Sequence, residues 1–434
     1  MLKRKFYNTL LEWKRKANKK PLFVRGARQV GKTFIVEYFA RKNYSSYIYL
    51  NFLENGEYKR IFDGALDAST IYSRITLMVP SARLVEHDSL IFLDEIQECG
   101  DARTSLKFLA QDGRYDVVAS GSLLGVQYKK VKSIPVGYEE SVTMHSLDFE
   151  EFLWAKGYSP DVVAKLQDAF ACRARVDDVL NDVMHREVRD YMAVGGMPAV
   201  VDAFVARRDY GEADAIQRQI VSDYLDDIMN YAPYGEKPKI RSCFLAIPRQ
   251  LARENENRKF KYAEVEKGVG ARKFWNSVEW LRDAAMADMA HNLTAPLFPL
   301  SAYEDESAFK LYLSDIGLLA AMYGFGTKAA IVNQMIGGSV KGGLYENLVS
   351  TILVRKGEAL RYLRDRREPL EVEFLIERGE NVIPVEVKAS NASTASLDRL
   401  LRRDDITVGY KLTGGNVGVV GKKITLPHYM AMFL

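Results

Sequence analysis

The sequence has little of what marks a membrane-spanning, disulfide-bonded or metal-binding protein. It has no run of about 18 consecutive apolar residues, so we expect no membrane span. The N-terminal stretch up to Lys20 is basic and amphipathic and lacks the apolar segment of a secretory signal, so we expect none. Cysteine occurs only at Cys99, Cys172 and Cys243, without a Cys-x-x-Cys pair, and the five histidines are scattered. This favours a reducing, cytoplasmic location and argues against a zinc site.

The chain also lacks a strong charge imbalance. Its net charge of +4 is too small to indicate nucleic-acid binding by itself. Eight Lys and Arg residues crowd the first twenty positions, and a solvated helix face is favoured over a nucleic-acid patch there. The length of 434 residues, with 47% hydrophobic and 27% charged residues, is typical of a globular protein of two to four domains.

A glycine-bounded loop lies between an apolar strand and a helix near the start of the chain. Residues 26–33 match the phosphate-binding pattern G-x-x-x-x-G-K-[ST]. The glycines let the backbone wrap around a phosphate, and the N–H groups of the following helix start face the anion. Lys32 would reach the β- and γ-phosphates of ATP, and the Thr33 hydroxyl would bind Mg²⁺. The residues predicted to contact the nucleotide are Gly26, Ala27, Arg28, Gln29, Val30, Gly31, Lys32 and Thr33. The alternative is a glycine-rich turn that binds nothing.

Residues 89–96 form an apolar stretch that ends in two carboxylates. A buried parallel strand would carry these acids to its carboxyl end, where nucleotides bind in open α/β sheets. Asp94 would then hold Mg²⁺, and Glu95 would orient and polarise the attacking water. Without the glycine loop, an apolar strand followed by two solvated acids would be the better interpretation.

Residues 116–122 form another short apolar strand, and it ends in hydroxyl groups. Ser120 or Ser122 is a candidate sensor of the γ-phosphate, and a serine-rich turn is the alternative. A further strand is predicted at residues 134–138, followed by a helix at 147–154. This alternation of strands and helices predicts a parallel α/β sheet.

Beyond this region the helical period dominates from residue 160 to residue 230, with a break at Gly-Gly-Met-Pro. Prolines and a glycine at 231–238 then indicate a domain boundary. The following pattern of three helices and two strands is typical of a winged helix. These elements are predicted at residues 240–253, 262–267, 271–286, 289–293 and 308–313. Arg272, Lys273 and Asn276 would read DNA, but nearby glutamates slightly favour a winged helix that packs inside the protein.

The C-terminal part of the chain combines a helix and two strands that carry acidic residues. These elements are predicted at residues 344–353, 370–377 and 382–389. Glu386 and Lys388 share one face of a strand, Glu373 lies on the strand before it, and Glu346 comes from the helix. Acids that converge beside a lysine are how metal-dependent nucleases bind Mg²⁺ and activate water. We predict that these four side chains converge, either as a nuclease site or as an ion-pair network.

Seven segments together resemble one known family. They lie at residues 26–33, 93–98, 119–124, 146–153, 195–200, 309–319 and 384–388. They resemble the prokaryotic AAA-type ATPases that carry a companion uncharacterised C-terminal domain. The resemblance implies an AAA/STAND-like P-loop sheet with an extra strand between the two motif strands, a winged helix, and a fold similar to PD-(D/E)XK nucleases. Relatives often have Asp where this chain has Glu373, and Arg where it has Tyr138, so the resemblance names no arginine finger.

These observations predict a cytoplasmic ATP-hydrolysing enzyme with ATP and Mg²⁺ as cofactors. Four domains are predicted: P-loop ATPase 1–157, helical linker 158–238, winged helix 239–335 and restriction-endonuclease-like domain 336–434. The nucleotide state would set the arrangement of the other modules. Double-stranded DNA is a candidate partner, an oligomer is compatible with the sequence, and no membrane is expected. The alternative is a nucleotide-dependent switch or scaffold with an inactive nuclease fold.

Overall fold

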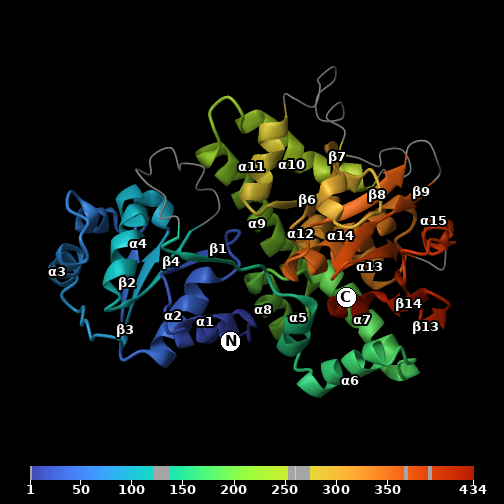
Figure 1. Cartoon of the computed structure of the whole chain (residues 1–434), viewed down its shortest axis with the longest axis horizontal. Helices are drawn as coiled ribbons and strands as arrows, with labels where there is room; N and C mark the ends of the chain where they lie inside the picture. The colour runs from blue at the N-terminus through green and yellow to red at the C-terminus, as the bar shows by residue number, and fades with distance from the viewer. Residues whose placement is uncertain (1, 122–136, 253–259, 261–273, 366–369, 390–392) are drawn as a thin grey trace. The chain divides into compact units, whose positions relative to one another are not determined.

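The structure is a computed structural model, and it divides into two compact units (Figure 1). It describes residues 2–121, 137–252, 260, 274–365, 370–389 and 393–434. The N-terminal unit consists of residues 4–146 with 283–285. The C-terminal unit consists of residues 1–3, 147–282 and 286–434.

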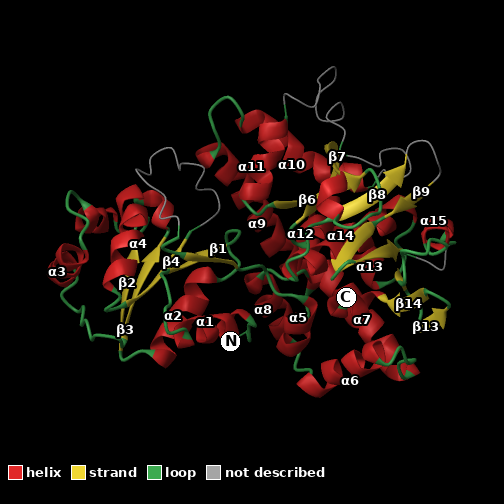
Figure 2. Cartoon of the chain, in the orientation of Figure 1, coloured by secondary structure: helices red, strands yellow, loops and turns green. Residues whose placement is uncertain are grey.

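The N-terminal unit is built on a five-stranded parallel sheet with the order β2-β3-β4-β1-β5. Its strands are β1 (Leu22–Arg25), β2 (Ser46–Asn51), β3 (Ser89–Asp94), β4 (Asp116–Ser120) and β5 (Glu140–Thr143). Every residue of β3 and β4 is buried, as expected for central parallel strands. Figure 2 draws the strands in yellow and the helices in red. The predicted parallel α/β sheet is confirmed, and β4 is the extra strand between β1 and β3.

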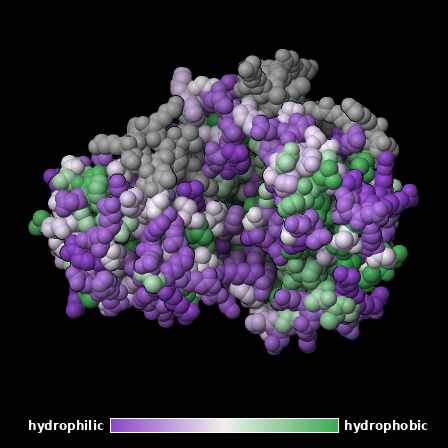
Figure 3. All heavy atoms as spheres, viewed as in Figure 1, coloured by the Kyte–Doolittle hydropathy of each residue, from purple (hydrophilic) through white to green (hydrophobic). Residues whose placement is uncertain are grey.

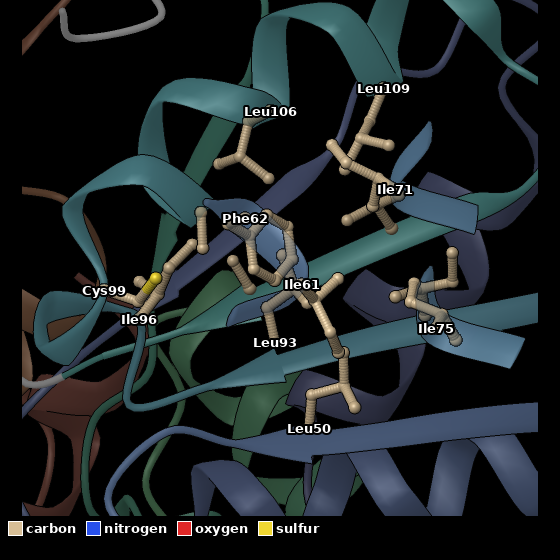
Figure 4. Close-up of a cluster of buried hydrophobic side chains, with 14 of the residues drawn as sticks. Leu50, Ile61, Phe62, Ile71, Ile75, Leu93, Ile96, Cys99, Leu106 and Leu109 are labelled. Atoms are coloured by element: carbon tan, nitrogen blue, oxygen red, sulfur yellow. The ribbon is translucent and has the colours of Figure 1, made fainter. Parts of the chain in front are cut away.

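One helix precedes these strands and others connect them. The first is α1 (Phe6–Arg15), and the connecting helices are α2 (Lys32–Asn43), η1 (Gly56–Phe62), α3 (Ala68–Met78), η2 (Ile96–Glu98) and α4 (Gly100–Asp112). One face of the sheet packs on η1, α3 and α4 through a core of aliphatic and aromatic side chains (Figure 4). This core includes Leu50, Ile61, Phe62, Ile71, Ile75, Leu93, Ile96, Leu106 and Leu109. Burial of this apolar surface fixes the strand ends that carry the polar residues of the site.

One predicted strand is misplaced. Residues 134–136 lie outside the described residues, Gly137 and Tyr138 lie in a turn, and the strand is β5, at Glu140–Thr143. The side chains of β5 are alternately half-buried and exposed. The strand was predicted too early in the chain because the residues just before this edge strand are more hydrophobic than the strand itself.

The C-terminal unit begins with the helices α5 to α10, and further helices alternate with its strands. The helices are α5 (Phe149–Ala155), α6 (Pro160–Ala171), α7 (Asp178–Val194), α8 (Pro198–Arg207), α9 (Tyr210–Tyr231), α10 (Lys237–Leu251), α11 (Trp275–Asp283), α12 (Ile316–Tyr323), α13 (Phe325–Val332), α14 (Gly338–Arg355) and α15 (Ala395–Leu400), with the short 3₁₀ helices η6 (Leu300–Tyr303) and η7 (His428–Phe433). The predicted helical region from 160 to 230 is thus confirmed as α6 to α9.

Two sheets complete this unit, with the orders β7-β6-β8-β9 and β10-β11-β12-β14-β13. Their strands are β6 (Ala287–Leu293), β7 (Glu304–Leu313), β8 (Arg361–Asp365), β9 (Leu370–Val372), β10 (Phe374–Arg378), β11 (Asn381–Val387), β12 (Gly409–Thr413), β13 (Gly418–Val420) and β14 (Lys423–Pro427). The predicted strand pair near residues 289–313 is present as the antiparallel β6 and β7. β6 also pairs in parallel with β8, so one sheet spans the predicted boundary at 335/336. The winged helix and the domain boundaries stay predictions.

A buried network of hydrogen bonds, which we call the lock, connects three of the family-like segments in the C-terminal unit. Leu147 N donates to Gly196 O over 2.7 Å, and Gly196 N donates to Asp315 Oδ2 over 2.8 Å. The hydroxyl of Tyr191 donates to Leu147 O over 2.7 Å and accepts from Arg355 Nη1 over 2.6 Å. A Cβ on Gly196 would lie 2.0 Å from Leu147 O. Segments 146–153, 195–200 and 309–319 therefore meet in one hydrogen-bonded core.

No helix in the described ranges is long and apolar enough to cross a membrane. On the face drawn in Figure 3, hydrophilic residues are interspersed with short apolar patches.

Candidate functional site

The glycine loop joins β1 to α2 in a backbone conformation that its sequence permits. Gly26 and Gly31 have φ angles of 149° and 92°, and Gln29 has a φ of 64°. A Cβ on Gly26 would lie 2.2 Å from the carbonyl oxygen of Met144. Glycine is required at position 26 by both its φ and this close approach. Because α2 begins at Lys32, the free N–H groups of its first turn belong to the predicted phosphate-binding loop.

Lys32 is buried beneath this loop, with 7% of its surface exposed. Its Nζ donates to Gly26 O over 3.0 Å and to Ala27 O over 2.8 Å. Burial lowers the pKa of this ammonium from 10.5 to about 8, although the charges of Glu95 and Asp94 oppose the shift. Lys32 is therefore held close to two carboxylates and to the loop carbonyls. Burial disfavours the charged form of its side chain.

Asp94, at the end of β3, accepts hydrogen bonds from four groups. Its Oδ2 accepts from Thr33 Oγ1 over 2.8 Å and from the Tyr49 hydroxyl over 3.0 Å. Its Oδ1 accepts from Ser120 Oγ and, over 3.1 Å, from the backbone N–H of Glu95. The carboxylate is buried, so these donors compensate for its lost hydration. The order of the parallel strands thus brings side chains of β2 and β4, together with Thr33 of α2, to the end of β3.

Glu95 follows Asp94 in the left-handed region, with a φ of 51° and a ψ of 45°. This conformation costs a non-glycine residue about 1 kcal/mol, and it turns the chain sharply at the end of the strand. Gln97 Nε2 donates to Glu95 Oε2. The Glu95 charge also raises the pKa of Lys32 against burial, which is consistent with a carboxylate near the loop.

The structure therefore brings together Thr33, Asp94 and Ser120 as the sequence predicted, and it adds Tyr49. Tyr49 lies on β2 and also accepts a hydrogen bond from Asn51 Nδ2 over 2.9 Å. No local sequence pattern marks Tyr49 as a site residue, because only the pairing of β2 with β3 places it beside Asp94. Ser122, the other candidate sensor, lies outside the described residues.

The donor set at this point fits Mg²⁺. A hydroxyl and a carboxylate lie within 2.8 Å of each other beside the phosphate-binding loop. Both are oxygen donors, which are the ligands that Mg²⁺ prefers in proteins alongside phosphates and water.

A second cluster lies in the C-terminal unit around Lys388. Its Nζ lies 2.9 Å from Glu373 Oε1 and 2.8 Å from Glu386 Oε1, and Val387 N donates to Glu373 Oε2 over 3.1 Å. Burial, followed by the charge of Glu373, raises the pKa of Glu386 to about 8. Burial opposes the charged form of Lys388, but the two carboxylates outweigh it and raise its pKa.

Glu346 belongs to a different set of contacts. It is buried on α14 and accepts hydrogen bonds from Lys310 Nζ over 3.2 Å and from the Tyr312 hydroxyl over 2.9 Å. Lys310 also pairs with Glu371 at 3.7 Å. Of the four predicted nuclease-like residues, three are thus in direct contact and Glu346 is held by neighbouring Lys310. Among the described residues, no group of three or more His, Cys, Asp or Glu has the geometry to hold a metal ion.

The predicted DNA-reading residues are mostly untested. Arg272 and Lys273 lie outside the described residues, whereas Asn276 is exposed on the first turn of α11. Val278 and Leu281 of the same helix are buried. The helix thus has an apolar face in the core and at least one polar residue facing solvent.

Three family models each match part of the chain. Residues 18–153 match an AAA domain, residues 185–329 match a domain of unknown function (DUF8612), and residues 341–426 match another domain of unknown function (DUF4143). The N-terminal unit therefore contains an AAA domain, and the predicted P-loop ATPase fold is confirmed in this coarse form. The winged helix and the nuclease-like fold are not tested by these matches. None of the curated proteins matches the chain.

Solved structures give only distant similarities. The ORC1 protein of Aeropyrum pernix in complex with DNA is 15% identical, covers 77% of this chain and 93% of its own, and has a TM-score of 0.28. AMPPCP-bound DnaA of Aquifex aeolicus is 13% identical over 64% of this chain and 86% of its own, with a TM-score of 0.26. PCH-2 of C. elegans is 11% identical over 41% and 50%, with a TM-score of 0.24. Similarities at these TM-scores carry no argument about function.

Proposed function

We propose that this chain is a Mg²⁺-dependent ATPase. The observation that carries the proposal is the contact between Thr33 and Asp94, because it joins the phosphate-binding loop to the acidic end of β3. The AAA-domain match over residues 18–153 supports the same proposal. The three free cysteines agree with action in a reducing, cytoplasmic compartment.

Each residue of the site has a proposed role. Lys32 exchanges its two loop carbonyls for the β- and γ-phosphates, and the N–H groups of residues 26–33 surround them. Thr33 and Asp94 hold Mg²⁺, which supplies charge neutralisation at the phosphates when bound. Glu95 orients the attacking water and accepts its proton. Ser120, at the end of β4, donates a hydrogen bond to Asp94 and senses the γ-phosphate.

We further propose that nucleotide state controls the C-terminal unit, and that double-stranded DNA is the partner on which this unit acts. The predicted winged-helix order and the acidic cluster with Lys388 support this proposal. The proposed domains are those predicted at 1–157, 158–238, 239–335 and 336–434.

A second function is favoured by one observation, the pair of contacts that Lys388 makes with the acids of the cluster. Its Nζ lies 2.9 Å from Glu373 Oε1 and 2.8 Å from Glu386 Oε1, so each of these acids has the lysine as a partner. In this alternative the nuclease-like fold is inactive, and the protein is a nucleotide-dependent switch or scaffold that self-associates.

ATP turnover, measured with and without double- and single-stranded DNA, distinguishes the two functions. Stimulation by DNA would support an ATPase that acts on DNA. An ATP turnover rate that DNA does not change, together with nucleotide-dependent self-association in sedimentation velocity, would support the switch. No turnover and no nucleotide binding with Mg²⁺ present would refute both.

A further inference from the structure

Arg4 bridges the phosphate-binding loop and the segment through which the chain leaves the N-terminal unit. Its Nη1 donates to Val30 O over 2.9 Å, and its Nη2 donates to His145 O over 2.6 Å. The chain enters this unit between Lys3 and Arg4 and leaves it between Ser146 and Leu147. One guanidinium therefore ties together the loop and both ends of the unit's main segment.

We call residues 144–147 the exit segment, and both of its ends are tightly held. At one end Met144 N donates to Arg25 O over 2.7 Å, and Met144 O would lie 2.2 Å from a Cβ on Gly26. At the other end Leu147 takes part in the lock, through its N–H to Gly196 and its carbonyl to Tyr191. Residues 144–147 thus connect, through the covalent backbone, a residue that packs on the phosphate-binding loop to a residue of the lock.

The loop that the exit segment contacts must change its bonding when nucleotide binds. Lys32 holds the carbonyls of Gly26 and Ala27, and it leaves them when it turns to the phosphates. Gly26 packs on Met144 O, and Val30 O accepts from Arg4. A shift of the loop backbone therefore reaches the exit segment by two routes, one steric and one through Arg4.

We propose that Arg4 is a positioning residue that couples the nucleotide state of the loop to the lock at Leu147. This inference rests on the proposed ATP binding at residues 26–33. A guanidinium suits the task because its rigid fork of donors can hold two carbonyls at once. A lysine at position 4 keeps the charge but offers one flexible ammonium, so it would hold both carbonyls less rigidly.

Hydrogen–deuterium exchange of the whole chain, with and without a non-hydrolysable ATP analogue and Mg²⁺, tests the coupling. The peptides to follow cover Leu147 and residues 191–200. In the parent, the analogue should change exchange there by roughly threefold or more. In Arg4→Ala this change should fall to near zero, while the analogue's Kd shifts by no more than about threefold, because Arg4 is not one of the residues predicted to contact the nucleotide.

Two further variants sharpen the test. Arg15→Ala removes an exposed arginine from α1, and the analogue should change hydrogen–deuterium exchange in this variant as much as in the parent. Arg4→Lys should give an intermediate change, and it replaces Arg4→Ala in the test if the alanine variant loses its cooperative melting. A full exchange change in Arg4→Ala would overturn the proposal, as would a parent that binds the analogue without any change at the lock. A parent that does not bind the analogue would refute the proposed function itself.

Discussion

The buried state of Lys32 predicts that ATP binding weakens as pH rises through about 8. Burial lowers the pKa of the free protein's ammonium to about 8, and bound phosphates should raise it because they favour the charged form. Binding then takes up a proton, so the affinity is full below this pKa and is lost above it. From about pH 7 to about pH 9 the charged fraction falls from roughly nine tenths to one tenth, so Kd should rise roughly tenfold, or about 1.4 kcal/mol.

Isothermal titration calorimetry with a non-hydrolysable ATP analogue measures this dependence directly. In buffers of different ionisation enthalpy at about pH 8, roughly half a proton should be taken up per nucleotide. Lys32→Arg is the matched control. Because a guanidinium stays charged over this range, the Kd of this variant for the analogue should not depend on pH. A parental Kd that is constant across this range would refute the reasoning.

Three other predictions concern separate parts of the molecule. Gly196→Ala should destabilise the C-terminal unit by about 1–3 kcal/mol or more, because its Cβ would overlap Leu147 O; a thermal melt of the variant checks this. Tyr49→Phe should leave the fold intact and lower the turnover number by removing one of the donors that orient Asp94, as steady-state ATPase assays would reveal. If the C-terminal cluster cleaves DNA, metal-dependent nicking of plasmid should disappear in Lys388→Ala, and nicking that persists would indicate a contaminant.

The N-terminal unit was predictable because its signals are local. The loop at 26–33 has a fixed spacing of glycines and a lysine, and the acids at 94 and 95 directly follow an apolar strand. Ser120 could also be predicted from its place at the end of a strand. Tyr49 and Arg4 could not, because their contacts depend on strand order and on a bridge across 141 positions.

The C-terminal unit was less predictable because its pairings are non-local. Alternation along the strand placed Glu386 beside Lys388, and the structure places Glu373, which was also predicted to join them, 2.9 Å from Lys388 Nζ. The helix position of Glu346 gave no indication that Lys310, 36 residues earlier, would bind it instead. Likewise, no local pattern indicated that β6 would pair with β8.

The central claim is that this chain hydrolyses ATP with Glu95 as the base. The direct measurement compares phosphate release by the parent and by Glu95→Gln at saturating ATP and Mg²⁺, with the Kd of a fluorescent ATP analogue measured for both. We expect the variant to retain the parental Kd within about threefold and to lose roughly a hundredfold or more in turnover. Hydrolysis at the parental rate in Glu95→Gln would contradict the claim.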